Sequence, residues 1–210
     1  MVLGDVIDSR KINDRNEFKN RLKRAISTVN NRHQDKIHAP FQILKGVDEI
    51  GGVICSVSPV ADIQKIFSRT LHPNAVRIAA VVGEIDVEEQ SKVVSQMDGM
   101  AFARADMVLS ELENSGSTFR LSGKNEQIDQ LVSDEINLLD IIRSGWSERR
   151  MEVVSEYDRL ERQKEVADEL GISVQAVSNH LRQSNVNRVL EIEERLSTNL
   201  KSYQNLSDDK

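Results

Sequence analysis

Side chains able to read a nucleic-acid duplex cluster towards the carboxyl-terminal end of the chain. Glutamine and asparagine amides can form paired bonds with adenine, arginine can do so with guanine, and serine can reach a base or a phosphate, whereas an alanine methyl can touch the thymine methyl. These residue types occur together at Ser173, Gln175, Ala176, Ser178, Asn179, Arg182 and Arg188. The pattern predicts base contacts from Gln175, Asn179 and Arg182. Phosphate contacts are expected from Ser173, Ser178 and Arg188.

The residues around these side chains predict a helix-turn-helix. Gly171 can adopt the positive φ of a tight turn, and Ala167 is small where two helices must cross closely. Ser173 is suited to cap the second helix. Apolar residues recur at the spacing of a shared core, at Val166, Leu170, Ile172, Val177 and Leu181. In such a unit the second helix enters the major groove. The alternative is a helical pair that only packs, or that contacts another protein.

Charge supports a small, local contact with DNA. The chain carries 28 Lys+Arg and 34 Asp+Glu, a net charge of −6, so no basic field covers the whole protein. Between residues 171 and 190, however, the only formal charges are Arg182 and Arg188. Few phosphate contacts imply modest affinity for one copy, which favours a homodimer bound to two half-sites.

An apolar stripe follows the predicted helix-turn-helix. It consists of Val189, Ile192, Leu196 and Leu200, at helical spacing. Such a stripe needs a partner surface. The sequence leaves two alternatives open: the stripe covers the core of its own chain, or it pairs two chains.

Carboxylates in the first part of the chain suggest a second chemistry. Asp5 lies on the first predicted strand, and Asp48 and Glu49 lie in a turn between the next two strands. In a β-α-β-β layout these segments are neighbours, so the acids can converge at one end of a sheet. Converging carboxylates hold Mg²⁺ or Mn²⁺ for phosphoryl transfer. Asp5 and Asp48 are therefore the candidate catalytic and metal-binding residues of an alternative function, with ordinary solvated acids as the simpler interpretation.

The elements expected to position these groups follow the order β-α-β-β-α-β-α-β. Strands are predicted near residues 2–7, 41–45, 52–57, 76–82 and 117–122. The first six elements correspond to the split β-α-β arrangement of ferredoxin-like and palm-type domains. From residue 123 onwards the pattern is helical. We therefore predict an α+β fold, with a ferredoxin-like domain at 1–144, a helix-turn-helix domain at 145–202 and a tail at 203–210.

The composition indicates the cellular compartment in which we expect the protein. The single cysteine, Cys55, excludes an intramolecular disulfide and is expected to be a buried, inert thiol in a reducing compartment. No apolar run approaches the length of a membrane span, and the first residues lack the pattern of a signal peptide. We expect a cytoplasmic protein without membrane contact.

Four motifs taken together resemble the SatD family. They are Gly-Asp-Val-Ile-Asp-Ser-Arg at 4–10, Val-Asp-Glu-Ile-Gly-Gly at 47–52, Arg-Ile-Ala-Ala-Val-Val-Gly-Glu at 77–84 and Met-Asp-Gly-Met-Ala-Phe-Ala-Arg-Ala at 97–105. The similarity runs over most of residues 1–182. The resemblance implies an α/β domain followed by a helix-turn-helix of the DNA-binding type.

The same motifs are distantly similar to class III nucleotidyl cyclases. That resemblance places Asp5 and Asp48 at the metal-binding positions of those enzymes. Val47 stands where the pattern has a glycine that lets the backbone approach a ligand, which argues against catalysis.

The leading prediction is a DNA-binding transcriptional regulator without a catalytic site or cofactor, whose α/β domain senses a small-molecule or nucleotide ligand or mediates dimerisation. The alternatives are a metal-dependent nucleotide-binding or nucleotidyl-transferring enzyme, with Mg²⁺ or Mn²⁺ and a nucleotide, and a pure protein-interaction module.

Overall fold

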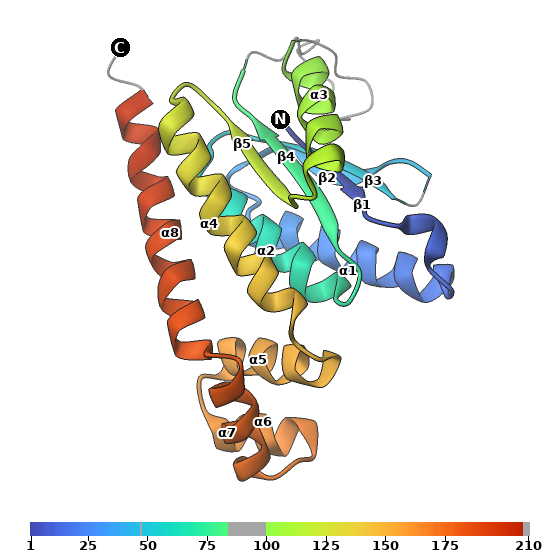
Figure 1. The fold of residues 1–210 in the computed structure, drawn as a ribbon, viewed down its shortest axis with the longest axis vertical. Coiled ribbons are helices and arrows are strands. Elements are labelled where there is room, and N and C mark those ends of the chain that lie inside the picture. Colours follow the sequence, from blue (N-terminus) through green and yellow to red (C-terminus); the bar gives the residue numbers. More distant parts are fainter. Residues whose placement is uncertain (47, 84–99, 208–210) are drawn as a thin grey trace.

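A computed structural model describes residues 1–46, 48–83 and 100–207 (Figure 1). Five strands form one sheet, flanked and extended by helices. In chain order the elements are β1 (Val2–Val6), η1 (Ser9–Lys11), α1 (Arg15–Arg32), β2 (Ile37–Lys45), β3 (Glu49–Ile54), α2 (Val60–Leu71), β4 (Val76–Val81), α3 (Met100–Ser115), β5 (Phe119–Ser122), α4 (Glu126–Ser144), α5 (Glu148–Leu160), α6 (Gln163–Leu170), α7 (Val174–Gln183) and α8 (Val186–Ser207). The predicted mixture of strands and helices is confirmed.

The sheet has the strand order β2-β3-β1-β4-β5. β1 is central and runs antiparallel to both β3 and β4, whereas β4 and β5 are parallel. β4 is apolar almost throughout, because both of its faces are covered. Ile78 and Ala80 enter the larger apolar core, and Ala79 and Val81 enter a smaller core on the opposite face.

Helices cover the two faces of the sheet unequally. α1 and α2 supply Leu22 and Phe67, both fully buried, to the larger core. α3 supplies Ala101 and Ala105 to the smaller core, where small side chains allow the helix to lie close to the strands. Asp14 caps α1 by accepting from the backbone amides of residues 16 and 17.

The carboxyl-terminal helices extend away from the sheet and then return to it. α5, α6 and α7 lie together at one end of the molecule, and α8 runs back beside α4 (Figure 1). Val189, Leu196 and Leu200 on α8 are buried in the same core that α1 and α2 line. The apolar stripe of α8 therefore covers its own chain, which settles that alternative. α8 also continues through Tyr203, a buried residue in the segment for which we predicted a tail.

Two local predictions are wrong. Cys55 is exposed rather than buried, because β3 ends at Ile54 and the thiol belongs to the connection that follows. The pair Ser58-Pro59 predicts that Ser58 caps α2. Instead, the hydroxyl of Ser58 pairs with that of Ser56 at 2.9 Å, and Pro59 occupies the capping position without a side-chain bond. Asp98 precedes the third predicted helix and is a candidate cap for it, but it lies outside the described residues. Within the described part of the chain, no helix has the length and apolar character needed to cross a membrane.

Candidate functional site

Local signals in the sequence determine the geometry of the α6–α7 pair. Gly171 ends α6 with a φ of 63°, the left-handed conformation that favours glycine. The hydroxyl of Ser173 accepts from the backbone amide of Ala176 at 3.1 Å and so caps α7. The inner faces of the pair are held by buried apolar side chains, at Val166, Ala167, Val177 and Leu181. This packing leaves the opposite face of α7 directed outwards.

Three of the predicted base-contacting residues lie next to one another on that outer face. The amide of Gln175 donates to Oδ1 of Asn179 at 3.4 Å, and the guanidinium of Arg182 donates to the same oxygen at 3.2 Å. Both hydrogen bonds lie at the protein surface. We call Gln175, Asn179 and Arg182 the α7 polar row. Its bonds are long, so each group can exchange them for an external partner at little cost.

The other predicted contact residues differ in exposure and in the helix on which they lie. Ser173 is exposed, whereas Ala176 and Ser178 are half-buried. Arg188 lies on α8, where its guanidinium forms a 2.7 Å ion pair with Glu191. The hydrogen bond from Arg188, followed by its charge, lowers the pKa of Glu191. Arg188 is exposed, but part of its charge is already compensated.

The structure adds two cationic residues to this region that sequence reasoning did not single out. Arg150 on α5 donates to the side-chain oxygen of Gln183, the last residue of α7, at 2.7 Å. Lys164 is exposed in the first turn of α6. Both come from a segment, residues 147–170, in which acidic residues outnumber basic ones. The net charge of this segment is negative, so it does not indicate a single cation, such as Arg150, whose side chain reaches the neighbouring helix.

Asp5 lies in the sheet opposite Glu49 of β3 and Arg77 of β4. A guanidinium nitrogen of Arg77 donates to Oδ2 of Asp5 at 3.3 Å. Burial raises the pKa of Asp5; the charge of Arg77 opposes this shift, and the charge of Asp48 adds to it. The predicted proximity of the first strand and the hairpin acids is therefore confirmed.

Asp48 has its own partners at this edge. Its carboxylate accepts from the hydroxyl of Ser9 at 2.7 Å, and its backbone carbonyl accepts from the amide of Val6 at 3.0 Å. No group of three or more His, Cys, Asp or Glu side chains in the described residues is arranged to hold a metal ion. Arg77 and Ser9 therefore already engage the two carboxylates of this pair.

A network of partly buried ion pairs joins the sheet-flanking helices to α5 and α8. Arg69 of α2 bonds Asp158 of α5 at 2.6 Å and Glu193 of α8 at 3.0 Å. Arg143 of α4 bonds the same Glu193 at 2.7 Å. Burial raises the pKa of Asp158, but the positive charge of Arg69 and then that of Lys65 outweigh this effect and hold it below its usual range. The network ties the α6–α7 region to the rest of the chain through residues far apart in sequence.

Comparison with known protein families identifies the family of this chain. The family model described as SatD family matches residues 1–200. This chain belongs to the SatD family. The match covers the sheet, α4 and all of the carboxyl-terminal helices up to Leu200. Comparison with curated proteins and with solved structures gave no match.

Proposed function

We propose that this SatD-family protein is a cytoplasmic DNA-binding transcriptional regulator. In this proposal α6 and α7 form a helix-turn-helix, and α7 enters the major groove. The α7 polar row would contact base edges, with Ala176 available to a thymine methyl. Ser173, Ser178 and Arg188 would contact phosphates.

The observation that carries the proposal is the composition of the α7 surface. The row presents two amides and a guanidinium on one exposed helix face, and α7 has no acidic side chain. Val174, at the start of α7, is 47% exposed although it is apolar. An apolar side chain beside amides and a guanidinium fits a groove that offers methyl groups as well as hydrogen-bonding edges.

For the α/β part we propose a ferredoxin-like, palm-type domain with a sensing or assembly role. The order β2-β3-β1-β4, with antiparallel neighbours throughout, supports this assignment. β5 then extends the sheet in parallel to β4.

We propose that the assembled form is a homodimer formed through α4. Leu131, Leu138 and Ile141 on this helix are 60–68% exposed, and Ile142 is 39% exposed. Clustered exposed apolar side chains on one helix are typical of an interaction surface on a soluble protein. A standard interface buries about 800 Å² per partner around such an apolar centre. A second copy can supply the same apolar face by a two-fold axis.

Binding of labelled duplex DNA to the full chain, followed by fluorescence anisotropy at two salt concentrations, tests the proposed function. Affinity should fall steeply with salt, because each phosphate contact contributes about −0.9 to the slope of log affinity against log salt. Absence of binding at low salt, or binding that is insensitive to salt, would instead favour the protein-interaction module.

A further inference from the structure

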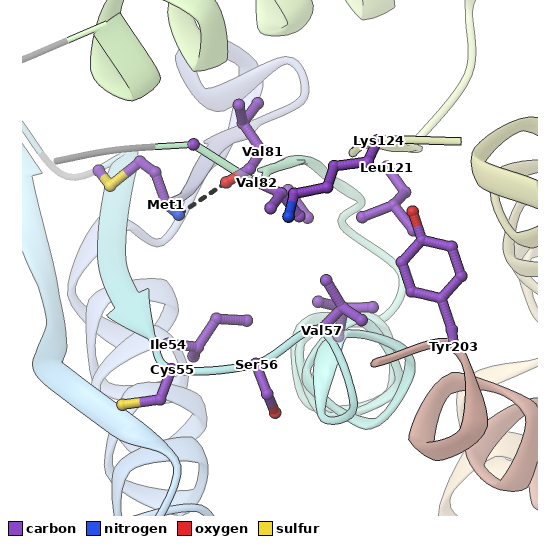
Figure 2. A pocket seen from close by; sticks show the side chains of 13 residues that line it. Met1, Ile54, Cys55, Ser56, Val57, Val81, Val82, Leu121, Lys124 and Tyr203 are labelled. Carbon is purple, nitrogen blue, oxygen red and sulfur yellow. Dashed lines mark hydrogen bonds between the residues drawn. The ribbon is translucent and has the colours of Figure 1, made fainter. Parts of the chain in front are cut away.

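A cavity of about 220 Å³ opens at the end of the sheet opposite to Asp5. Figure 2 shows it between the carboxyl ends of β4 and β5, the segment that precedes α2, and Tyr203 of α8. The parallel strands β4 and β5 end at the same edge of the sheet. Small molecules often bind in the crevice outside the carboxyl ends of parallel strands.

The side chains around the cavity are mostly aliphatic. Ile54 and Val57 lie on one side, Val82 and Leu121 lie on the other, and the ring of Tyr203 closes the end (Figure 2). Such walls stabilise a bound molecule by removing apolar surface from water and by close contact. They therefore favour a ligand that is itself apolar.

The polar side chains at the cavity already have partners. The hydroxyl of Ser56 pairs with that of Ser58 at 2.9 Å, in the segment that precedes α2. The phenol of Tyr203 donates to Oδ1 of Asp129 at 2.7 Å. Lys124, at the rim, is engaged as well. These described groups do not depend on a ligand for a partner.

The backbone at the edge of the cavity is paired too. The amides of Cys55, Val81 and Val82 donate to backbone carbonyls at 2.8 to 2.9 Å, and the amine of Met1 donates to the carbonyl of Val81 at 2.8 Å. The thiol of Cys55 is exposed and points away from the enclosed space (Figure 2). A polar ligand atom in this cavity would lose its water without gaining a partner. Each such atom would weaken binding by roughly ten- to a hundredfold.

The volume of the cavity sets the size of the ligand. An apolar cavity of about 150 Å³ stays dry and can bind benzene. By the same ratio, a cavity of about 220 Å³ admits roughly nine non-hydrogen atoms. A fused bicyclic hydrocarbon has this size.

We propose that this cavity binds a small, neutral, apolar molecule of the size of a bicyclic hydrocarbon. The ligand lies between Val57 and Leu121 and makes apolar contacts only. The cavity discriminates against polar and charged molecules, because the polar groups around it are already paired. The proposal gives a ligand class to the sensing role proposed above, and it rests on the proposed function for its regulatory meaning only.

Tyr203 links the cavity to the α6–α7 pair. Its ring belongs to α8, which begins at Val186, shortly after α7 ends at Gln183. Leu196 and Leu200 of the same helix are buried in the core. A ligand packed against the ring of Tyr203 would therefore contact the helix that directly follows α7.

Isothermal titration of the full chain with indene and with benzimidazole tests the chemical class of the ligand. The two molecules have the same fused bicyclic shape, but benzimidazole carries two ring nitrogens that would find no partner in the cavity. Indene should bind at least tenfold more tightly than benzimidazole at a pH where both are neutral. The titration contains no DNA, so failure of this proposal and failure of the DNA-binding proposal can be told apart.

A substitution and a spectrum test the location of the site. Val82→Phe, with folding checked by circular dichroism, should fill part of the cavity and weaken indene binding at least tenfold. Met107→Phe places the same ring at a residue of α3 that is 64% exposed, and it should leave the affinity unchanged. In methyl NMR spectra of the wild-type chain, indene should shift the signals of Val57, Val82 and Leu121.

Three results would each overturn the proposal. They are no binding of indene by the wild-type chain, equal affinity for indene and benzimidazole, and indene binding that survives Val82→Phe.

Discussion

At the scale of single residues, the proposed function depends on the α7 polar row. Arg182 and Gln175 share Oδ1 of Asn179 through bonds of 3.2 and 3.4 Å. Neither bond is short, and both lie at the surface. A base edge can therefore replace this internal contact without leaving a buried group unpaired.

Replacing Arg182 by Ala is expected to cost about 1 to 3 kcal/mol of discrimination between the preferred base pair and its competitors, because one bidentate contact to guanine is lost. Competition between duplexes that differ at a single position measures this cost. Arg159→Ala, which removes an exposed, ion-paired arginine from α5, should leave the discrimination unchanged. Equal loss of binding to every duplex would reassign Arg182 to a phosphate contact.

A substitution at Asp5 separates the regulator from the enzyme alternative. Burial raises the pKa of Asp5, so its ionised form is disfavoured in the folded chain. This cost is fully present above the folded-state pKa and is lost as pH falls from there to the unfolded-state pKa. Removal of this charge by Asp5→Asn should therefore not lower the free energy of unfolding at neutral pH. Thermal unfolding with a nucleoside triphosphate and Mg²⁺ or Mn²⁺ should show no ligand-dependent shift in either protein. A shift in the wild-type chain that Asp5→Asn abolishes would establish the metal-dependent alternative.

At the scale of elements, the α6–α7 turn was predictable because its signals are local. Gly171 and Ser173 act within a few residues of their own position, through backbone conformation and a capping bond. The apolar spacing of 163–182 likewise depends only on helix periodicity.

Gly171→Ala tests this turn. A methyl group there would meet no atom within 4 Å, but φ is +63°, so the cost is backbone strain of about 1 kcal/mol. Gly116→Ala is a matched control, since Gly116 has φ +74° and equally open surroundings. Denaturant unfolding should show similar losses for the two variants. Only Gly171→Ala should weaken DNA binding, because only this turn orients α7; equal DNA affinities for the two variants would contradict that role.

The ion-pair network could not have been predicted from the sequence, because its members belong to four different helices. Arg69, Arg143 and Glu193 are separated by 50 to 124 positions, and the pattern of charges along each helix does not show which of them meet. The exposure of Cys55 was not predicted for a related reason. β3 ends where its pairing with β2 stops, and the apolar residues around Cys55 do not mark that point.

The network makes a prediction for acid stability. The folded-state pKa of Asp158 lies below its usual range, so this carboxylate stabilises the fold above the unfolded-state pKa, and the contribution is lost as pH falls through the folded-state value. Asp158→Asn should lower the free energy of unfolding at neutral pH and flatten its decline below about pH 4. Denaturant unfolding measured across this range, with Asp168→Asn on α6 as the control, checks the effect. An unchanged pH profile would show that the Arg69–Asp158 bond contributes nothing measurable.

At the scale of the whole molecule, the chain joins two regions that the sequence suggested as separate. α8 connects them: its first turns follow α7, and its later turns are buried against the sheet-flanking core. The sequence indicated that the apolar stripe of α8 packs against another surface, but it did not show which surface that is. The choice depends on where α4 and α2 lie in space, which no local pattern specifies.

The exposed face of α4 predicts the oligomeric state. The full chain should have twice the 23.7 kDa mass of one copy in light scattering. Leu138→Glu should shift it to the monomer, because a charge at the centre of the apolar face opposes its burial. Met107→Glu changes a comparably exposed apolar residue on α3 and should leave the dimer intact. A monomeric wild-type chain, or a dimer that tolerates Leu138→Glu, would refute the α4 interface.

The most direct test of the central claim is a selection of bound sequences from a random pool of duplex DNA. The full chain would be used at two salt concentrations, and the Arg182→Ala variant would be selected in parallel. We predict enrichment of a two-fold symmetric site, weaker at high salt, with one position relaxed in the variant. A pool without an enriched sequence at low salt would contradict DNA reading by α7.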